Sequence, residues 1–438
     1  MRVVQITPGS GDNFYCENCL RDAALIRAMR DLGHDVVIVP MYLPLQEAAD
    51  GRASTAPIFF GGVNVYLQQK SAFFRKTPRW LDRLFDAPAL LRWVARKAHM
   101  TSAKDLSETT LSMLQAEQGR QKKELERLIE WLSVQDNKPD VVCLSNALLA
   151  GLARSVKARL GVPVVCLLQD EDGFLDALGP HYAKPAWQML TERCRDVDAF
   201  ISVSRYYADV MRQRLELRPD RVHVVYMGIS LDGYEPPQRR PDVPTIGYLS
   251  RMSASKGLDT LVEAFIKLKK NDKLRDLKLR IAGGSTGDDE EFIGQIRRQL
   301  SALGLIDDVE FVAGFDHQAR TGFLQSLSVL SVPERQPVAY GLYALEALAA
   351  GVPVVQPASG VFPELLDITG GGLLFEPNSA DALAAALESL LLDPERARQL
   401  AERGREKILE KFHVRQTAKE MLRICQTVVQ QFHGDSDA

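Results

Sequence analysis

Short, unbroken apolar runs recur along the first half of the chain, and they predict the strands of a parallel sheet. They cover residues 2–7, 35–40, 140–145, 163–169, 198–204 and 222–226, with a helical stretch at 19–32 between the first two. Strands covered on both faces read as continuous apolar runs rather than as alternating ones. The first strand, helix and strand therefore predict a βαβ unit, and the first half as a whole predicts a doubly wound α/β domain.

The same plan repeats in the second half. Strands are expected at 245–250, 277–282, 309–313, 328–333 and 353–356, and helices at 258–270, 291–303 and 342–350. Between the two series, residues 231–244 are too rich in proline for a helix or a central strand, so they predict a linker that could act as a hinge. We therefore predict two Rossmann-like domains facing each other across a cleft, over residues 1–238 and 239–413.

Two segments fall outside this repeat. Leucines spaced among polar residues predict a helical insertion in the first domain at about 70–132. A last helix within 414–438 could pack on the second domain or cross back to the first.

Composition narrows the class of protein. With 438 residues, 46% of them apolar, the chain is long enough for two hydrophobic cores, and a net charge of −3 gives no reason to expect nucleic acid as a partner. Six sparse cysteines fit a reducing cytosol, and we expect neither a signal peptide nor a membrane-spanning run. We expect a cytoplasmic protein, leave docking to a membrane surface open, and infer no oligomeric state.

Two basic residues follow the strand expected at 245–250. They are Arg251 and Lys256 in the loop RMSASKG. Open α/β sheets bind ligands beyond the carboxyl ends of their strands, where a guanidinium can form paired hydrogen bonds to phosphate and an ammonium acts as a point charge. We therefore expect a phosphorylated ligand here, and a solvated surface loop is the alternative.

The segment YGLYALEALAAGVP, at 340–353, places Glu346 in a helix that is apolar on nearly every side. An ionised carboxylate is costly to bury alone, so Glu346 needs donors, which could be the hydroxyl groups of a bound polyol or a neighbouring backbone group. Gly341 at the helix start offers N–H groups to a pyrophosphate. Gly283 and Gly284, after another strand, either let a ligand approach the backbone or form a simple turn.

The first half offers candidates of its own. Gly9 and Gly11 precede the first helix and could face a phosphate or a sugar, but the third glycine of a dinucleotide fingerprint is missing, which disfavours a nicotinamide enzyme. The strand at 163–169 ends in Gln169, and the acids Asp170 and Glu171 come directly after it. We expect at least one acid of this loop to face the substrate, where it could orient sugar hydroxyls or act as a base.

Cys16 and Cys19 form a lone CxxC pattern. No second pair completes the four ligands of a structural zinc, and a redox role would need a lowered thiol pKa, which a sequence does not establish. We therefore expect two thiols beside the glycine loop, lining or shaping the acceptor cleft, and no metal site.

In their order along the chain, these segments resemble the nucleotide-sugar-dependent glycosyltransferases of family 4, which have the GT-B fold. The resemblance covers nearly the whole chain, including FGGVNVY at 60–66, and is strongest over 245–387, where R-x4-K-G, Gly-Gly, G-L-x-x-L-E-A-x-A-x-G-x-P-V-V and GGGLLF follow one another. It implies that Arg251 and Lys256 neutralise the donor diphosphate and that Glu346 binds the ribose hydroxyls. It also implies that the backbone around Gly341 and Leu342 meets the phosphates.

Two positions depart from the family's pattern. The family's first glutamate, eight positions before Glu346, is Val338 here, and Glu334 is expected to reach the donor sugar only if the loop 334–340 is rearranged. Gln169 stands where the family often has a histidine, and an amide can hydrogen-bond a sugar but cannot shuttle a proton at neutral pH.

The expected activity, as the resemblance implies, is transfer of a sugar from a UDP-, GDP- or ADP-sugar to a carbohydrate or other acceptor, with retention at the anomeric carbon. Arg251, Lys256 and the helix start at Gly341 would stabilise the leaving diphosphate, Asp170 is the candidate base, and no metal is required. A phosphorylase or epimerase of the same fold is one alternative. A non-catalytic sugar-nucleotide-binding protein is another, suggested by Val338 and Gln169.

Overall fold

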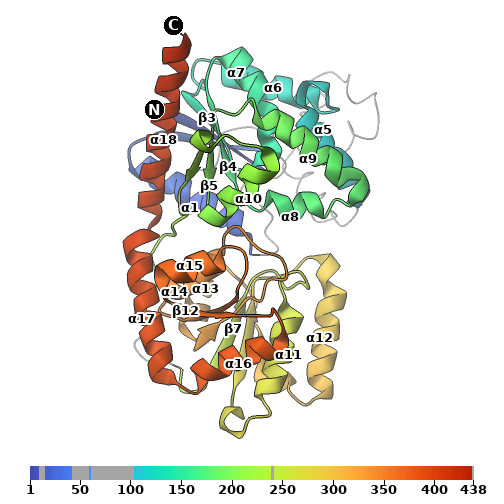
Figure 1. Cartoon of the computed structure of the whole chain (residues 1–438), viewed down its shortest axis with the longest axis vertical. Coiled ribbons are helices and arrows are strands. Elements are labelled where there is room, and N and C mark those ends of the chain that lie inside the picture. The colour runs from blue at the N-terminus through green and yellow to red at the C-terminus, as the bar shows by residue number, and fades with distance from the viewer. Residues whose placement is uncertain (9–14, 42–58, 61–102, 238–240, 437–438) are drawn as a thin grey trace. The chain divides into compact units, whose positions relative to one another are not determined.

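The computed structural model describes residues 1–8, 15–41, 59–60, 103–237 and 241–436 (Figure 1). The chain divides into two compact units. The first unit is Met1–Gly11, Asp22–Tyr226 and Thr417–Ala438, and the second is Asp12–Arg21 and Met227–Gln416.

The units begin and end at other residues than the predicted domains. Residues from Met227 onward belong to the second unit because Ile229 forms a parallel bridge with His413, and because the carbonyl oxygen of Tyr234 accepts a hydrogen bond from Arg405 Nη1 at 2.6 Å. The last helix belongs to the first unit from Thr417 onward. A short early segment, Asp12–Arg21, groups with the second unit although it precedes most of the first.

The first unit is built on a parallel sheet with the strand order β2-β1-β3-β4-β5-β6. Its central strands are fully buried apolar runs, as strands covered on both faces require. The strands are β1 (Arg2–Thr7), β2 (Asp35–Pro40), β3 (Val141–Leu144), β4 (Val164–Leu168), β5 (Ala199–Ser202) and β6 (Val222–Val224).

Helices pack around this sheet (Figure 1). They are α1 (Glu17–Asp31), α5 (Ala103–Gln115), α6 (Lys122–Ser133), α7 (Ala153–Leu160), α8 (Glu171–Asp176), α9 (Pro180–Cys194), α10 (Arg205–Leu215) and α18 (Val414–Ser436). The described part of the predicted insertion is α5 and α6; residues 70–102 lie outside the described residues. Helix α18 is anchored on the sheet because Cys425 is fully buried, with its Sγ 3.7 Å from the Sγ of Cys143 in β3.

The second unit is built on another parallel sheet, with the order β12-β11-β10-β7-β8-β9. Its strands are β7 (Thr245–Leu249), β8 (Lys278–Ala282), β9 (Val309–Phe311), β10 (Val329–Leu330), β11 (Val354–Pro357) and β12 (Gly372–Phe375). The order of the strands reverses between β7 and β10. Ligands bind at this switch point in open α/β sheets, beyond the carboxyl ends of the strands.

The helices of the second unit are α11 (Leu258–Leu268), α12 (Glu290–Ala302), α13 (His317–Gln325), α14 (Leu342–Ala349), α15 (Phe362–Thr369), α16 (Ala380–Leu391) and α17 (Pro394–Lys411). Helix α11 packs against α16, and α14 packs against α17 (Figure 1). Helix α14 is buried at every position, which explains its almost wholly apolar sequence. Among the helices that the structure describes, none combines the length and the apolar character needed to cross a membrane.

Candidate functional site

The switch point of the second sheet gathers most of the predicted donor-site residues. Arg251 and Lys256 lie in the loop that follows β7, and Glu334 and Gly341 lie in the loop that follows β10. The two loops also touch directly, because the backbone N–H of Arg335 donates to the carbonyl oxygen of Ser255 at 3.1 Å. The parallel topology thus places residues from two distant parts of the sequence at one edge of one sheet.

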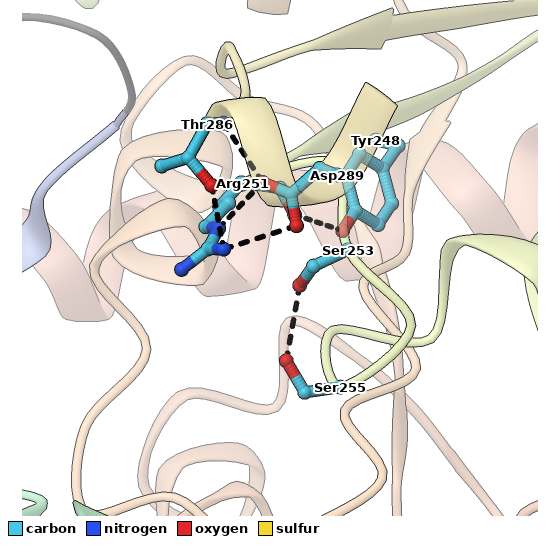
Figure 2. Close-up of polar contacts among 6 residues, drawn as sticks. All are labelled: Tyr248, Arg251, Ser253, Ser255, Thr286 and Asp289. Atoms are coloured by element: carbon cyan, nitrogen blue, oxygen red, sulfur yellow. Dashed lines mark hydrogen bonds and ion pairs between the residues drawn. The ribbon is translucent and has the colours of Figure 1, made fainter. Parts of the chain in front are cut away.

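Figure 2 shows how Arg251 is held. Its Nε donates to Asp289 Oδ2 at 2.7 Å, and its Nη2 donates to Asp289 Oδ1 at 3.0 Å and to Thr286 Oγ1 at 2.8 Å. This paired geometry fixes the plane of the guanidinium. The side chain of Arg251 is one-third exposed, whereas that of Asp289 is buried.

A capping box in the turn before α12 fixes the position of Asp289, the residue that holds Arg251. Thr286 and Asp289 form a capping box around a short 3-10 turn, in which each side chain accepts a hydrogen bond from the other's backbone N–H. Burial alone would raise the pKa of Asp289, but the hydrogen bonds from Arg251 and Thr286 outweigh burial and lower that pKa. Asp289 therefore stays ionised as a counter-charge to Arg251 across the neutral pH range.

Lys256 forms an ion pair across the two loops. Its Nζ lies 2.8 Å from Oε1 of Glu334, which also accepts a hydrogen bond from the hydroxyl of Tyr343 at 3.1 Å. The side chain of Glu334 is 3% exposed and that of Lys256 is 28% exposed, so the ammonium is the accessible member of the pair. Pro333 and Glu334 lie beside Gly257 and Lys256, and the expectation that Glu334 reaches the donor sugar only after a rearrangement of its loop stays a prediction.

Gly257 brings the two loops this close. Its φ of +71° lies in the left-handed region, and a Cβ at this position would stand 1.9 Å from the carbonyl oxygen of Pro333. Only glycine satisfies both conditions. The glycine that ends the R-x4-K-G motif therefore has a structural task beside the chemistry of Arg251 and Lys256.

Glu346, in α14, lies inside a cluster of polar side chains that come from other parts of the chain. Its Oε1 accepts hydrogen bonds from the hydroxyl of Tyr234 at 2.5 Å and from Arg320 Nε at 3.2 Å, and its Oε2 accepts one from the hydroxyl of Tyr15 at 2.8 Å. All four side chains are buried. Burial and the nearby Glu346 carboxylate raise the pKa of both tyrosines well above the usual range, so their hydroxyls remain donors.

The carboxylate of Glu346 is therefore not alone in its helix. We expected a bound polyol or a backbone group to supply its donors, but the donors here are protein side chains, among them a guanidinium that balances the charge. Burying the pair is tolerable because two tyrosine hydroxyls complete the hydrogen bonds of the carboxylate.

The start of α14 carries a carboxylate where the sequence predicts a phosphate. Gly341, at φ +152°, provides no side-chain cap for the helix, and the backbone N–H of Leu342 donates to Glu17 Oε2 at 2.7 Å. A carboxylate at this position is favoured by the positive end of the helix dipole. Gly283 takes part as well, since its carbonyl oxygen accepts a hydrogen bond from the backbone N–H of Tyr15 at 2.7 Å.

Cys16 and Cys19 are joined by a disulfide, with 5.4 Å between their Cα atoms. The expectation of two thiols is wrong. Residues 12–21 group with the second unit, and the expectation that the pair lines or shapes the acceptor cleft stays a prediction. Cys16 directly precedes α1 and Cys19 lies in its first turn, and this spacing of three residues brings their sulfurs together.

The predicted acids after β4 lie in the first unit and have different surroundings. Glu171 is buried and accepts hydrogen bonds from the backbone N–H groups of Ala147 and Gln169 and from the hydroxyl of Tyr207. Burial raises its pKa to about 7, although these hydrogen bonds favour the ionised form. Asp170 is partly exposed and, at φ +50°, turns the chain from β4 into α8.

Gln169 is buried at the end of β4. Its Nε2 donates to the carbonyl oxygen of Ser145 at 2.6 Å, and its Oε1 has no hydrogen-bond partner among the described residues. Of the other candidates, Val338 is partly exposed in the loop before α14. Gly9 and Gly11 lie outside the described residues, and so does most of the FGGVNVY segment.

The sequence did not predict the residues that bond to Glu346 and Arg251. Arg320, Tyr234 and Tyr15 surround Glu346 without any local motif that could have indicated them. Asp289 did leave a signal, because Thr286 and an acid three residues later form the pattern of a capping box. Among the residues that the structure describes, no group of three or more His, Cys, Asp or Glu side chains could hold a metal ion, and the prediction that no metal is required stays a prediction.

Two family models match adjoining parts of the chain. The model described as Glycosyl transferases group 1 matches residues 235–407, and the one described as Glycosyltransferase Family 4 matches residues 113–232. The chain belongs to glycosyltransferase family 4. The first match contains the complete switch-point site, from Arg251 to Glu346.

Similar proteins of known name and structure agree with this family. An alpha-maltose-1-phosphate synthase of Mycolicibacterium smegmatis is 27% identical over 412 residues, which are 85% of this chain and 97% of that protein. An MMP alpha-(1->4)-mannosyltransferase of Mycolicibacterium hassiacum is 25% identical over 243 residues, 55% of this chain. This match and two others to D-inositol 3-phosphate glycosyltransferases span only about half of each relative's length (57%, 58% and 48%).

Among solved structures, sucrose-phosphate synthase from Thermosynechococcus elongatus superimposes with a TM-score of 0.74 at 18% identity, covering 98% of this chain and 99% of that one. At this level of identity the likeness shows the fold alone. The fold is GT-B, with two parallel six-stranded sheets.

Proposed function

We propose that this protein transfers a sugar from a nucleotide diphosphate sugar to an acceptor hydroxyl, with the diphosphate bound at the switch point of the second unit. The observation that carries the proposal is the position of Lys256. Its ammonium stands at the carboxyl end of β7, in the loop that contacts the loop after β10, and its counter-ion Glu334 is more deeply buried than Lys256 itself. A phosphate that approached this edge of the sheet would meet the cation first.

Arg251 supports the same role. Asp289 and Thr286 hold its guanidinium in a fixed plane while one-third of the side chain stays exposed. Preorganised cations of this kind stabilise the charge that a leaving diphosphate gains in the transition state, without reorganisation at the moment of reaction. Arg251 and Lys256 are therefore the residues to which we assign catalysis, and retention at the anomeric carbon is the outcome that membership of family 4 favours.

The remaining assignments follow from the site. Gly341 and Leu342 would bind phosphate oxygens through the start of α14, Gly283 and Gly284 would border the nucleotide, and Glu346 would accept the ribose hydroxyls once Tyr15 has left it. In the first unit, Gln169 offers a buried amide oxygen that has no partner among the described residues and would bind a hydroxyl of the sugar. Asp170, which is more exposed than Glu171, is the better candidate base. By their names, relatives glycosylate D-inositol 3-phosphate or synthesise alpha-maltose 1-phosphate, so phosphorylated polyols and sugars head the list of acceptors to be tested.

A binding experiment tests the donor site. Isothermal titration of the full chain with UDP, GDP and ADP should identify one preferred base, and Lys256→Ala should weaken that binding about ten- to hundredfold, since hydrogen bonds to charged groups contribute roughly 1.5–3 kcal/mol. The matched control is Lys267→Ala, which removes an exposed lysine from α11 that pairs with Asp381. Equal affinity in the two variants would refute the assignment of Lys256.

A turnover experiment then separates transfer from binding alone. The preferred nucleotide is supplied as its glucose and mannose derivatives with a panel of sugar phosphates, and products are measured by mass spectrometry. Val338, in place of the family's first glutamate, favours a second candidate, a sugar-nucleotide-binding protein without turnover. Tight binding with no product and no released nucleoside diphosphate would select it, and sugar phosphate released only with added inorganic phosphate would select a phosphorylase.

A further inference from the structure

The short segment Tyr15–Cys19 occupies the groups that the proposed function assigns to the nucleotide sugar. The hydroxyl of Tyr15 bonds to Glu346, the backbone N–H of Tyr15 bonds to Gly283, and the carboxylate of Glu17 accepts the first N–H of α14. All of these residues belong to the second unit. One segment thus engages the expected ribose partner, the expected phosphate partner and one of the glycines expected beside the nucleotide.

The chemistry of each contact imitates a ligand. The phenol hydroxyl donates to Glu346 as a ribose hydroxyl would, and the carboxylate meets the positive end of a helix as a phosphate would. The ring of Tyr15 also lies 5.9 Å from the guanidinium of Arg320, so the segment contacts both members of the buried ion pair. Tyr15 is only 3% exposed, which means that no nucleotide can reach Oε2 of Glu346 while it stays in place.

The disulfide ties these contacts to one another. Cys16 lies between Tyr15 and Glu17, and its bond to Cys19 closes a loop of four residues at the start of α1. With the bond closed, Tyr15 and Glu17 are presented together. With the bond open, each must be ordered separately, and the chain-entropy relation for a loop of four residues predicts that the bound segment becomes roughly twentyfold less stable.

We propose that the segment Tyr15–Cys19 is an internal occupant of the donor site, and that reduction of the Cys16–Cys19 disulfide by a dithiol releases it. One thiolate of the dithiol attacks a sulfur of the disulfide, which gives a mixed disulfide and one cysteine thiol. The second thiol of the reductant then displaces the other cysteine, so that Cys16 and Cys19 end as thiols and the reductant as a disulfide. Both cysteines are partly exposed, whereas the four others are buried.

This inference rests on the proposed function, because the occupied groups are assigned to the donor there. While the segment is bound, the apparent affinity for nucleotide is reduced by the fraction of molecules in which the site is open. An oxidising environment keeps the site occupied and a reducing one opens it. Donor binding would therefore respond to the redox potential of the thiols and disulfides around the protein.

The test uses the full chain and the nucleoside diphosphates UDP, GDP and ADP, titrated with and without dithiothreitol. Dithiothreitol should tighten binding to the wild-type protein by about ten- to twentyfold. The double variant Tyr15→Phe with Glu17→Gln should bind about tenfold or more tightly even without reductant, because it loses two hydrogen bonds to carboxylates. Asn18→Ala, in the same turn, is the matched control and should behave as the wild type.

A second pair of variants isolates the disulfide. Cys16→Ser with Cys19→Ser should bind nucleotide as the reduced wild type does, and dithiothreitol should change nothing further. Hydrogen exchange at the backbone N–H of Leu342 follows the segment without any nucleotide, and this N–H should exchange faster after reduction, because Glu17 no longer protects it.

The outcomes are separable. If nucleotide binds equally to the oxidised, reduced and Tyr15→Phe with Glu17→Gln proteins, the segment does not occupy the donor site and the inference is overturned. Weaker binding by that double variant also overturns it, since Tyr15 and Glu17 would then contact the donor themselves. If no nucleotide binds to any of these proteins while Leu342 exchange still rises on reduction, it is the proposed function that fails and the redox release that stands.

Discussion

The buried pair of Arg320 and Glu346 allows a stability prediction whose size follows from the structure. Arg320→Met removes the guanidinium and fills its space with an apolar side chain of similar length. It leaves Glu346, whose side chain is 3% exposed, with two tyrosine hydroxyls and no positive charge. Removing one member of a buried ion pair costs about 3–5 kcal/mol. The variant also loses the hydrogen bond from Arg320 Nη1 to the carbonyl oxygen of Phe315.

The second unit contains about 200 residues, and each kcal/mol shifts the melting temperature of a unit of that size by roughly 2–4 °C. We therefore expect the melting temperature of the second unit to be roughly 6–20 °C lower in Arg320→Met than in the wild type. The sequence of the second unit, residues 12–21 and 227–416, contains no tryptophan, and Trp131 and Trp187 belong to the first unit. Circular dichroism reports both units while tryptophan fluorescence reports the first, so the fluorescence transition serves as an internal control.

A second substitution checks the cause. Glu346→Gln combined with Arg320→Met removes both charges and leaves an amide oxygen that the tyrosines can still bond. If the cost comes from an unbalanced carboxylate, the double variant should be more stable than Arg320→Met, with a coupling energy of about 2–3 kcal/mol. A single variant that loses less than about 1 kcal/mol, or a double variant no better than the single, would refute this reasoning.

Two further predictions concern backbone space and pH. Gly257→Ala should destabilise the second unit by about 3 kcal/mol or more, because its Cβ meets the carbonyl oxygen of Pro333. Gly304→Ala, at a similar φ of +67° but with open space around it, should cost only about 1–2 kcal/mol, and equal thermal shifts for the two would contradict the steric argument. Burial raises the pKa of Glu171 from 4.5 to about 7, so its contribution to stability is present in full below about pH 4.5 and is lost as the pH rises through about 7. We therefore expect urea unfolding, followed by tryptophan fluorescence, to show that the free energy of unfolding of Glu171→Gln rises by up to about 3 kcal/mol relative to that of the wild type between pH 4.5 and 8. Parallel pH curves for the two proteins would argue against a raised pKa of Glu171.

Strands and their order along the chain could be predicted because each is a short, buried apolar run. The continuous runs at 2–7 and 35–40 coincide with β1 and β2, and the predicted helix at 342–350 ends one residue beyond α14. The run at 328–333 was less informative, since only Val329–Leu330 is a strand. Its apolar character continues into a loop whose Pro333 has no N–H to donate to a neighbouring strand.

The position of Arg251, Lys256 and Gly341 could also be predicted, because parallel topology fixes where the ends of strands lie. The partners of Glu346 could not. Tyr15 lies 331 residues away in the sequence, and Arg320 sits in a helix whose sequence has no pattern that distinguishes a buried arginine from an exposed one. The disulfide was missed for a related reason, since a CxxC pattern alone does not tell whether the thiols are joined.

Helix α18 has a consequence for how the protein is made. The first unit begins with the earliest strand of the chain, yet it includes the residues from Thr417 onward, and Cys425 packs on β3. A ribosome delivers both pieces of the second unit, and every strand of the first sheet, before it delivers that helix. Domains generally fold during synthesis as soon as their residues emerge. The first unit, although it begins with the earliest strand, therefore cannot complete its packing at Cys143 of β3 until this last helix has been synthesised.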